Sequence, residues 1–356
     1  MADNIICKVK LAETAGGEAI YNNPEEGGGD VITICGEHGC GKTRQAIELI
    51  RQYAENGAAV VVLDVYGSFS DDQLMAFGVD QDALNIARID ASVTGVPCGI
   101  LSRISSGEKL ESDDSMALFY NRITKTFDVT DKCRKEIWSV INSRRVVERM
   151  KTIGFRAWTE AAQNAVNVLG TQISSEFITK LKPLAEGNYL TAEKPVYPGG
   201  GISIIDLTKV PRRSAWGFVE IILTDIWQSA SENVFKSHGL VIAIDEAHEA
   251  YFGDDGAIRK IIDMGRKYRL GLILISQDIR SSKIMFKRVS ASDYRLYFRQ
   301  RTENARYFAK ILMPRDVAKI TSELSNMPIG GMLIEGTKEF EGCTITAPMY
   351  GYNVLE

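Results

Sequence analysis

A glycine-rich run ends in a lysine and a threonine near the start of the chain, in the order Gly36-Glu-His-Gly-Cys-Gly-Lys-Thr43. An apolar stretch, Val31 to Cys35, comes directly before it, and a helical pattern over residues 44–55 follows. A strand, a G-x-x-x-x-G-K-T run and a helix are typical of a phosphate-binding loop. Backbone N–H groups and the start of the helix would hold a triphosphate there. A strand-to-helix turn without a ligand is the alternative interpretation.

Individual residues of this loop have separate expected roles. Lys42 would reach the β- and γ-phosphates, and the hydroxyl of Thr43 would bind magnesium. The sequence therefore predicts ATP and Mg²⁺ as cofactors. The residues expected to line the nucleotide are Gly36, Gly39, Cys40, Gly41, Lys42, Thr43 and Arg44.

Two acids follow a second apolar run, Leu240 to Ile244. Because ligands of open α/β sheets bind at the carboxyl ends of strands, Asp245 and Glu246 are expected to lie at that edge. Asp245 would hold the magnesium shell through water, and Glu246 would orient and polarise the water that attacks the γ-phosphate. The alternative is that these acids cap the next helix.

Gln277 follows a third apolar run, residues 271–276. An amide at this edge can donate to the γ-phosphate and accept from the attacking water, so Gln277 is predicted to sense the γ-phosphate. Ordinary loop polarity is the alternative. The letters Asp-Glu-Ala-His248 invite a helicase interpretation, but the chain after them is too short for a second lobe. His248 is therefore interpreted as a helix-start residue or a neighbour of the nucleotide.

Short apolar runs alternate with helical patterns over most of the chain. This alternation predicts an α/β fold of the RecA type, with a parallel-rich central sheet covered on both faces and an inserted all-α subdomain. The expected strands are residues 5–11, 31–35, 59–64, 201–207, 240–244, 271–276, 294–299 and 331–335. The expected domains are an N-terminal strand and linker (1–30), the first part of the core (31–104), the all-α insertion (105–195) and the second part of the core (196–356).

Composition limits the classes of function. With 356 residues and 45% hydrophobic residues, the chain is large enough for a packed core. Its formal net charge of −4 excludes a polycation, so any contact with nucleic acid must come from local patches. The six cysteines lack paired spacing, which suggests reduced thiols in a cytoplasmic protein. No apolar run reaches the about 18 residues that span a bilayer, so no direct membrane insertion is expected.

Further segments accompany the phosphate loop and the acids in a fixed order. They are residues 64–69, 95–101, 204–207, 265–277 and 327–336. In this order the chain resembles the HerA/FtsK superfamily of P-loop ring ATPases over about residues 30–337, and most of all the HerA-like DNA translocases. The residues before the phosphate loop are too few for the N-terminal β-barrel of HerA proper, so the chain resembles a minimal, barrel-less form.

The resemblance implies a function and a set of partners. It implies a homo-hexameric ring with ATP between subunits, which hydrolyses ATP to translocate or package double-stranded DNA. Lys42, Thr43, Asp245, Glu246 and Gln277 match the nucleotide-site residues of the family. Two alternatives stay open: a conjugation or secretion ATPase that moves protein or assembles a pilus, and a nucleotide-gated scaffold for a nuclease or defence effector. A nuclease, a capsid or secretion machinery would be the partner.

Ring motors complete each site with an arginine from the neighbouring subunit. Arg299 is the first candidate for this catalytic arginine and Arg266 the second. Each of them also fits a solvated or salt-bridged surface residue. Further candidates are Lys267, Arg295 and Arg301.

A translocase that accepts every sequence would contact the phosphates of duplex DNA. Two basic patches fit this requirement, although charge runs are usually solvated faces. The first patch consists of Arg280, Lys283, Lys287 and Arg288, and the second of Arg144, Arg145, Arg149 and Lys151.

Overall fold

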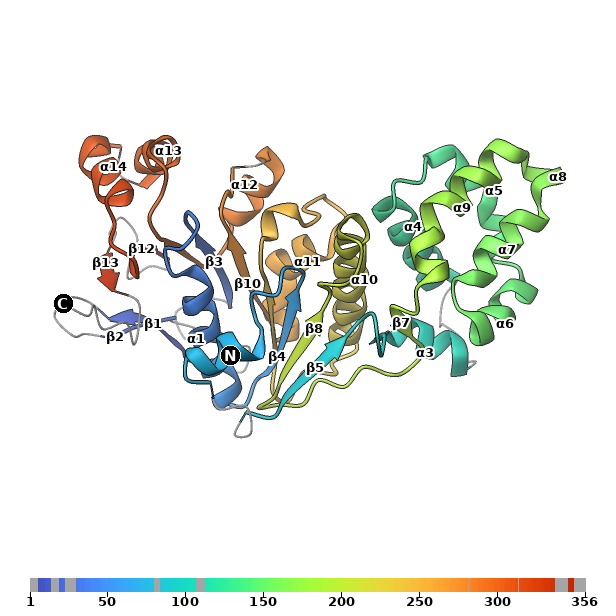
Figure 1. The fold of residues 1–356 in the computed structure, drawn as a ribbon, viewed down its shortest axis with the longest axis horizontal. Helices are drawn as coiled ribbons and strands as arrows, with labels where there is room; N and C mark the ends of the chain where they lie inside the picture. Colours follow the sequence, from blue (N-terminus) through green and yellow to red (C-terminus); the bar gives the residue numbers. More distant parts are fainter. Residues whose placement is uncertain are drawn as a thin grey trace. The chain divides into compact units, whose positions relative to one another are not determined.

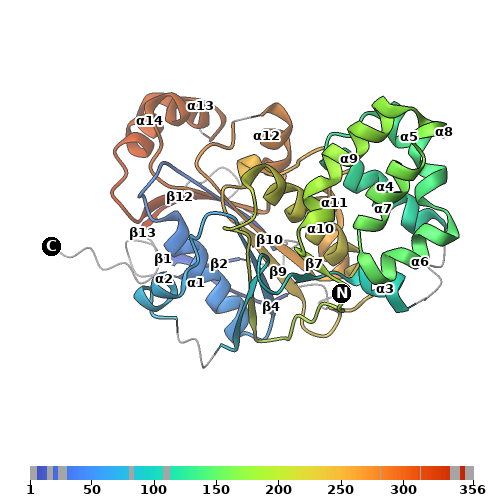
Figure 2. The same cartoon turned by 45° about the vertical axis from the view of Figure 1, so that its right-hand side comes forward.

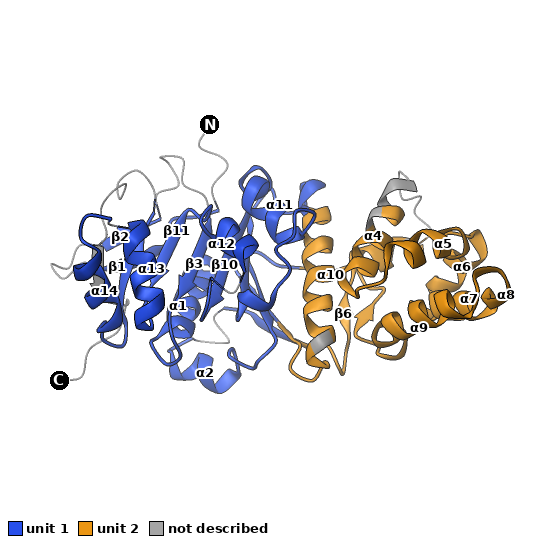
Figure 3. Ribbon diagram, turned by 90° about the horizontal axis from the view of Figure 1, so that it is seen from above, with its two compact units in different colours: residues 1–88, 197–204, 230–356 blue, residues 89–196, 205–229 orange. Residues whose placement is uncertain are grey.

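The computed structural model describes residues 6–13, 19–22, 30–79, 84–106, 113–280, 282–312, 314–336 and 345–348. These residues form two compact units, each described separately below (Figure 3). Unit 1 lies within residues 1–88, 197–204 and 230–356, and unit 2 within residues 89–196 and 205–229.

A nine-stranded sheet is the centre of unit 1, with the order β13-β12-β11-β3-β10-β9-β4-β8-β5 (Figure 1). The neighbours β11, β3, β10, β9 and β4 run parallel, and β12 pairs with β11 antiparallel. The strands are β3 (Val31–Cys35), β4 (Ala59–Asp64), β5 (Ile86–Asp90), β8 (Ile202–Asp206), β9 (Leu240–Ile244), β10 (Leu270–Ser276), β11 (Tyr294–Tyr297), β12 (Gly331–Glu335) and β13 (Ile345–Pro348).

The central strands are almost entirely apolar because helices cover both faces of a parallel sheet. Every residue of β3, β4, β9 and β10 is buried. The predicted α/β fold with a parallel-rich sheet is therefore confirmed. The helices of unit 1 are α1 (Lys42–Glu55), α2 (Asp71–Ala76), α11 (Ala257–Met264), α12 (Lys283–Val289), α13 (Thr302–Leu312) and α14 (Val317–Ser325), with 3₁₀ turns η1 (Ala247–Glu249) and η2 (Gly265–Tyr268).

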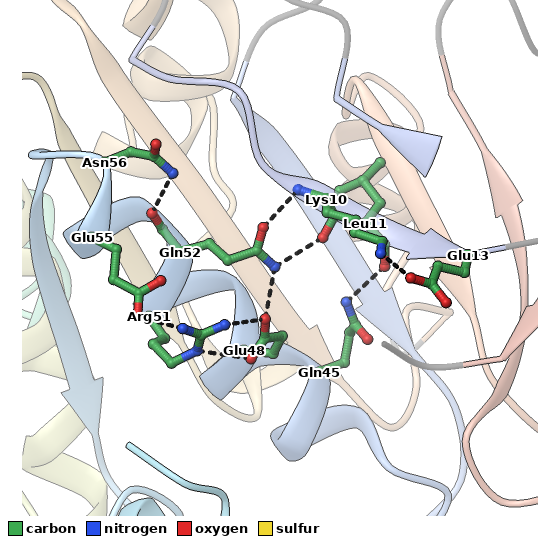
Figure 4. Close-up of polar contacts among 9 residues, drawn as sticks. All are labelled: Lys10, Leu11, Glu13, Gln45, Glu48, Arg51, Gln52, Glu55 and Asn56. Carbon is green, nitrogen blue, oxygen red and sulfur yellow. Dashed lines mark hydrogen bonds and ion pairs between the residues drawn. The ribbon is translucent and has the colours of Figure 1, made fainter. Parts of the chain in front are cut away.

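A small antiparallel pair, β1 (Lys10–Glu13) and β2 (Ala19–Tyr21), is bound to helix α1 through glutamine side chains (Figure 4). The amide of Gln52 accepts from Lys10 N at 2.7 Å and donates to Lys10 O at 3.1 Å, and Gln45 donates to Leu11 O at 2.9 Å. The predicted strand over residues 5–11 thus begins too early. Residues 23–29, expected as a linker, lie outside the described residues.

Unit 2 is mainly helical and has an aromatic core. Helix α7 packs against α9 (Figure 2), and the Trp158 ring lies 5.5 Å from Tyr120 and 5.1 Å from Phe155. Unit 2 includes residues on both sides of the expected insertion, residues 105–195. Its elements are α3 (Gly99–Ser106), α4 (Asp113–Thr126), α5 (Asp131–Ile141), α6 (Arg144–Ile153), α7 (Arg156–Asn164), α8 (Val166–Leu169), α9 (Thr171–Glu186), most of α10 (Arg212–Ser231), and the two-residue strands β6 (Val96–Pro97) and β7 (Leu190–Thr191).

The length and hydropathy of a helix decide whether it can cross a membrane. In the described ranges, no helix combines the length and the apolar character that crossing a bilayer requires.

Candidate functional site

Neighbouring strands of the sheet bring the predicted site residues to one edge. Strand β3 lies between β10 and β11, and Cys35, its last residue, pairs with Ser276 and with Tyr297. Strand β9 lies on the other side of β10, where Ile244 pairs with Leu274. The segments that follow β3, β9, β10 and β11 therefore leave the sheet side by side. These segments are the glycine-rich loop, the acid pair, Gln277 and Arg299.

The glycine-rich loop is held closely against the end of β11. Gly36 N donates to Ser276 O at 3.3 Å, and Glu37 N donates to Arg299 O at 2.8 Å. A Cβ at Gly36 would lie 2.7 Å from Cβ of Phe298, so only glycine fits this approach. Gly39 and Gly41 of the same loop have φ angles of 74° and 109°. Glycine adopts these left-handed angles without the steric cost that a side chain adds.

The side chains of the loop fold back onto one of its carbonyls. The buried Lys42 donates through Nζ to Glu37 O at 2.8 Å, and Sγ of Cys40 lies 2.9 Å from the same oxygen. Burial raises the pKa of the Cys40 thiol, which makes it a poor nucleophile. Thr43 and Arg44 are half-buried at the start of α1, and the Arg44 guanidinium lies 5.6 Å from the centre of the Phe77 ring.

Asp245 and Glu246 lie directly beyond β9. Asp245 is buried, and its Oδ1 accepts from Glu246 N at 2.9 Å. Burial raises the pKa of Asp245, hydrogen bonds from Ser68 and Glu246 N lower it, and the charges of Glu246 and Asp64 raise it further. A carboxylate in this position gains from a cation beside it. Asp245 is thus suited to hold a metal shell.

Two residues near Asp245 were not assigned a role from the sequence. Asp64 ends β4 and accepts from Gly67 N at 2.7 Å and Phe69 N at 3.0 Å, which fixes the turn that carries Ser68. Ser68 then bonds to Asp245. A buried acid at the end of a second parallel strand was the available signal, because such acids reach the same edge of the sheet.

Glu246 is held by residues from two elements. Gln277, one residue past β10, donates through Nε2 to Oε1 of Glu246. His248 Nδ1 lies 3.2 Å from Oε2 of Glu246 and 3.4 Å from Oγ of Ser276. Burial alone would raise the pKa of Glu246. The hydrogen bonds from His248 and Gln277, together with the charges of His248 and Lys42, outweigh burial and lower the pKa. The structure therefore places Gln277 against Glu246, and its role as a sensor of the γ-phosphate stays a prediction.

The His248–Glu246 pair gives a testable pH dependence. The hydrogen bond to Glu246 outweighs partial burial, so we expect the pKa of His248 to lie above 6.5. The charged pair then stabilises the fold below pH 6.5, and this contribution is lost as the pH rises through the pKa of His248. In an NMR titration, Glu246→Gln should lower the pKa of His248. An unchanged pKa would refute the pairing, and the other two histidines, His38 and His238, supply reference signals.

The candidate arginines have different surroundings. Arg299 donates through Nε to Oε1 of Glu37 in its own chain. Arg295 pairs with Glu335 at 2.8 Å. Arg266, on η2, is exposed, as are Lys267 and Arg301. The assignment of Arg299 or Arg266 as a catalytic arginine in trans stays a prediction.

The first basic patch is only partly available to a ligand. Arg280 donates to Oδ1 of Asn304 at 2.9 Å and lies 4.3 Å from the centre of the Tyr307 ring, and Arg288 pairs with Asp254. The exposed members are Lys283 and Lys287 of α12. In the second patch Arg149 pairs with Glu160, Lys151 lies 3.1 Å from Glu148, and Arg144 and Arg145 are exposed.

The donors at the sheet edge fit a magnesium–nucleotide complex. The Thr43 hydroxyl and the Asp245 carboxylate are hard oxygen ligands, and Mg²⁺ in such sites takes one or two protein oxygens beside phosphates and water. Over the described ranges, no cluster of three or more His, Cys, Asp or Glu residues is arranged to hold a metal by itself. A cavity of about 1070 Å³ in unit 2, lined in part by Lys151, Arg156 and Lys182, lacks this combination of loop and acids.

Comparisons with known proteins establish the fold. No family model and no curated protein matches the chain. VirB4 of Thermoanaerobacter pseudethanolicus superposes with a TM-score of 0.71 at 16% identity over 97% of this chain and 96% of that one. The bacterial conjugative coupling protein TrwB, in complex with sulphate, has a TM-score of 0.67 at 13% identity over 97% of this chain and 89% of that one. TrwB in complex with ADP and Mg²⁺ has a TM-score of 0.59 at 14% identity over 99% of this chain and 91% of that one. At these identities the likeness shows that the chain has the RecA-like fold of these P-loop ATPases.

Proposed function

We propose that this chain is an ATP-hydrolysing motor of the HerA/FtsK superfamily, with its site at the carboxyl edge of β3, β9 and β10. The observation that carries the proposal is the position of Glu246 beyond β9, in contact with Gln277 from the neighbouring strand. The glycine-rich loop follows β3, the next strand in the sheet. The complex of TrwB with ADP and Mg²⁺ supports ATP and Mg²⁺ as the cofactors.

Each site residue has a role in this reaction. Loop amides and Lys42 bind the phosphates, and Thr43 and Asp245 hold Mg²⁺, which neutralises phosphate charge when bound. Glu246 accepts a hydrogen bond from the attacking water and polarises it. The amide of Gln277 fixes the orientation of Glu246, which it contacts already. Lys42 must exchange Glu37 O for a phosphate oxygen, since its Nζ is bonded to that carbonyl.

We infer further that a homo-hexameric ring of this chain moves double-stranded DNA. The exposed Lys283 and Lys287 of α12 support phosphate contact, because exposed cations attract a nucleic-acid backbone. A conjugation-type ATPase that moves protein or assembles a pilus is the second candidate, and the likeness to VirB4 and TrwB favours it. A partner would be a nuclease, a capsid or a secretion complex, according to which candidate holds.

The first test is the steady-state ATPase rate with and without long duplex DNA. We expect DNA to stimulate hydrolysis several-fold, since a motor couples its chemistry to its substrate. Replacing both Lys283 and Lys287 with glutamate should reduce this stimulation. It should also make DNA binding less sensitive to salt concentration, because each lost phosphate contact reduces the slope of log affinity against log salt concentration. Lys132→Glu with Lys135→Glu, two exposed lysines on α5, is the matched control.

The outcomes separate the two candidates. Stimulation that is lost in the α12 variant but kept in the α5 control supports a DNA motor. A basal rate that depends on Glu246 and does not respond to DNA would contradict DNA translocation and favour the protein-moving ATPase. Light scattering of the ATP-bound protein should show a hexamer in either case.

A further inference from the structure

The phosphate loop of this chain carries an acid. Glu37 directly follows Gly36, the first glycine of the loop. A triphosphate is strongly anionic, and like charges repel one another when they are close and partly shielded from water. A carboxylate in a loop that binds phosphate therefore requires a neutralising partner.

Arg299 is that partner within the same chain. Its Nε donates to Oε1 of Glu37, and its carbonyl accepts from Glu37 N at 2.8 Å. The two side chains are 32% and 29% exposed, so water shields the pair only in part. The close approach of Gly36 to Phe298 holds the end of β11 against the loop. Main chain and side chain together fix Arg299 beside Glu37.

Glu37 also organises the rest of the loop. Its carbonyl accepts from Nζ of Lys42 at 2.8 Å and lies 2.9 Å from Sγ of Cys40. The residue therefore connects the lysine that would bind phosphate with the arginine that neutralises the acid. A freed Glu37 carboxylate would be an alternative partner for Lys42, because an unpaired carboxylate attracts the nearest cation.

We propose that Arg299 acts within its own subunit as a positioning residue. It neutralises Glu37 and so maintains the affinity of the phosphate loop for a nucleoside triphosphate. This inference rests on the proposed function, because the charge of Glu37 matters only if the loop binds phosphate. It differs from a role for Arg299 in the site of a neighbouring subunit, since a guanidinium bonded to Glu37 is engaged at its own site.

The test compares the affinity for a fluorescent ATP analogue, with Mg²⁺, in four proteins: the unaltered chain, Arg299→Gln, Glu37→Gln and the double variant. We expect Arg299→Gln to weaken binding about 10-fold, because a charged group near the ligand loses its partner. Glu37→Gln alone should bind at least as tightly as the unaltered chain. The double variant should return to within about 2-fold of it, because no unpaired charge remains.

Three controls make the result decisive. Arg306→Gln, at an exposed arginine on α13, should bind like the unaltered chain. Thermal unfolding without nucleotide shows whether each variant folds. If Arg299→Gln does not fold, Arg299→Lys should restore both folding and binding, since the positive charge is what the proposal requires.

Two results would overturn the inference. One is a double variant that binds as weakly as Arg299→Gln. The other is an Arg299→Gln protein with unchanged affinity and a lost turnover that Glu37→Gln does not rescue, which is the behaviour of an arginine acting in trans. Failure of the unaltered chain to bind the analogue would refute the proposed function itself, and the inference with it.

Discussion

Replacing Glu246 with glutamine is expected to lower the rate of ATP hydrolysis about 1,000-fold and to leave ATP binding intact. In the proposed mechanism the carboxylate polarises the attacking water, and an amide has no comparable basicity. The substitution preserves the size of the side chain, so contacts with Gln277 and His248 have room to persist. In the same mechanism the loop that follows β3 holds the phosphates, so affinity should not depend on Glu246. Single-turnover hydrolysis and equilibrium binding measure the two effects separately.

The matched control for this substitution is Glu249→Gln. Glu249 lies on the same 3₁₀ turn, η1, and is exposed. We expect its hydrolysis rate to stay close to that of the unaltered chain. A Glu246→Gln protein that keeps more than about a tenth of the rate would contradict a role for Glu246 in activating water. In that case the nucleotide-gated scaffold becomes the better interpretation.

The sheet was predictable where burial leaves only one pattern of residues. Strands β3, β4, β9 and β12 have the predicted bounds, because nearly all of their residues are buried and apolar. Strand β5 was missed since Ile86–Asp90 is half-exposed and mixes charged and apolar residues. The strand predicted over residues 5–11 overlaps β1 only at Lys10 and Leu11, and β2 was missed, because strands of three or four residues are too short for an alternating pattern.

The candidate site was predictable where a local motif fixes it and not where distant segments meet. The glycine-rich loop and the acid pair each follow a strand, and their positions at one sheet edge follow from the strand ends. Glu37 and Arg299 are 262 residues apart, and their contact depends on β11 lying next to β3. Nothing local in either segment indicates that neighbour. The bond between Ser68 and Asp245 likewise depends on β4 pairing with β9.

Trp158→Ala is the substitution with the largest expected effect on stability. The side chain is fully buried in unit 2, between the rings of Tyr120 and Phe155. Replacing a buried tryptophan by alanine costs about 3–5 kcal/mol. Within the described residues, Nε1 of Trp158 has no hydrogen-bond partner, so its removal also relieves an unsatisfied donor. We therefore expect a loss near the lower end, about 3 kcal/mol in the free energy of unfolding of unit 2.

This substitution also tests whether residues 105–195 form a subdomain of their own. If they do, urea unfolding of the Trp158→Ala protein should show an early transition in helical signal while ATP binding, a property of unit 1, persists beyond it. Val168→Ala is the control, because Val168 is 84% exposed on α8. This substitution should change the free energy of unfolding by no more than about 0.5 kcal/mol. A single transition in which helical signal and ATP binding are lost together would mean that the core and the helical segment fold as one cooperative unit. The helical segment would then belong to the same folding unit as the core, and its substitutions would change ATP affinity as well as stability.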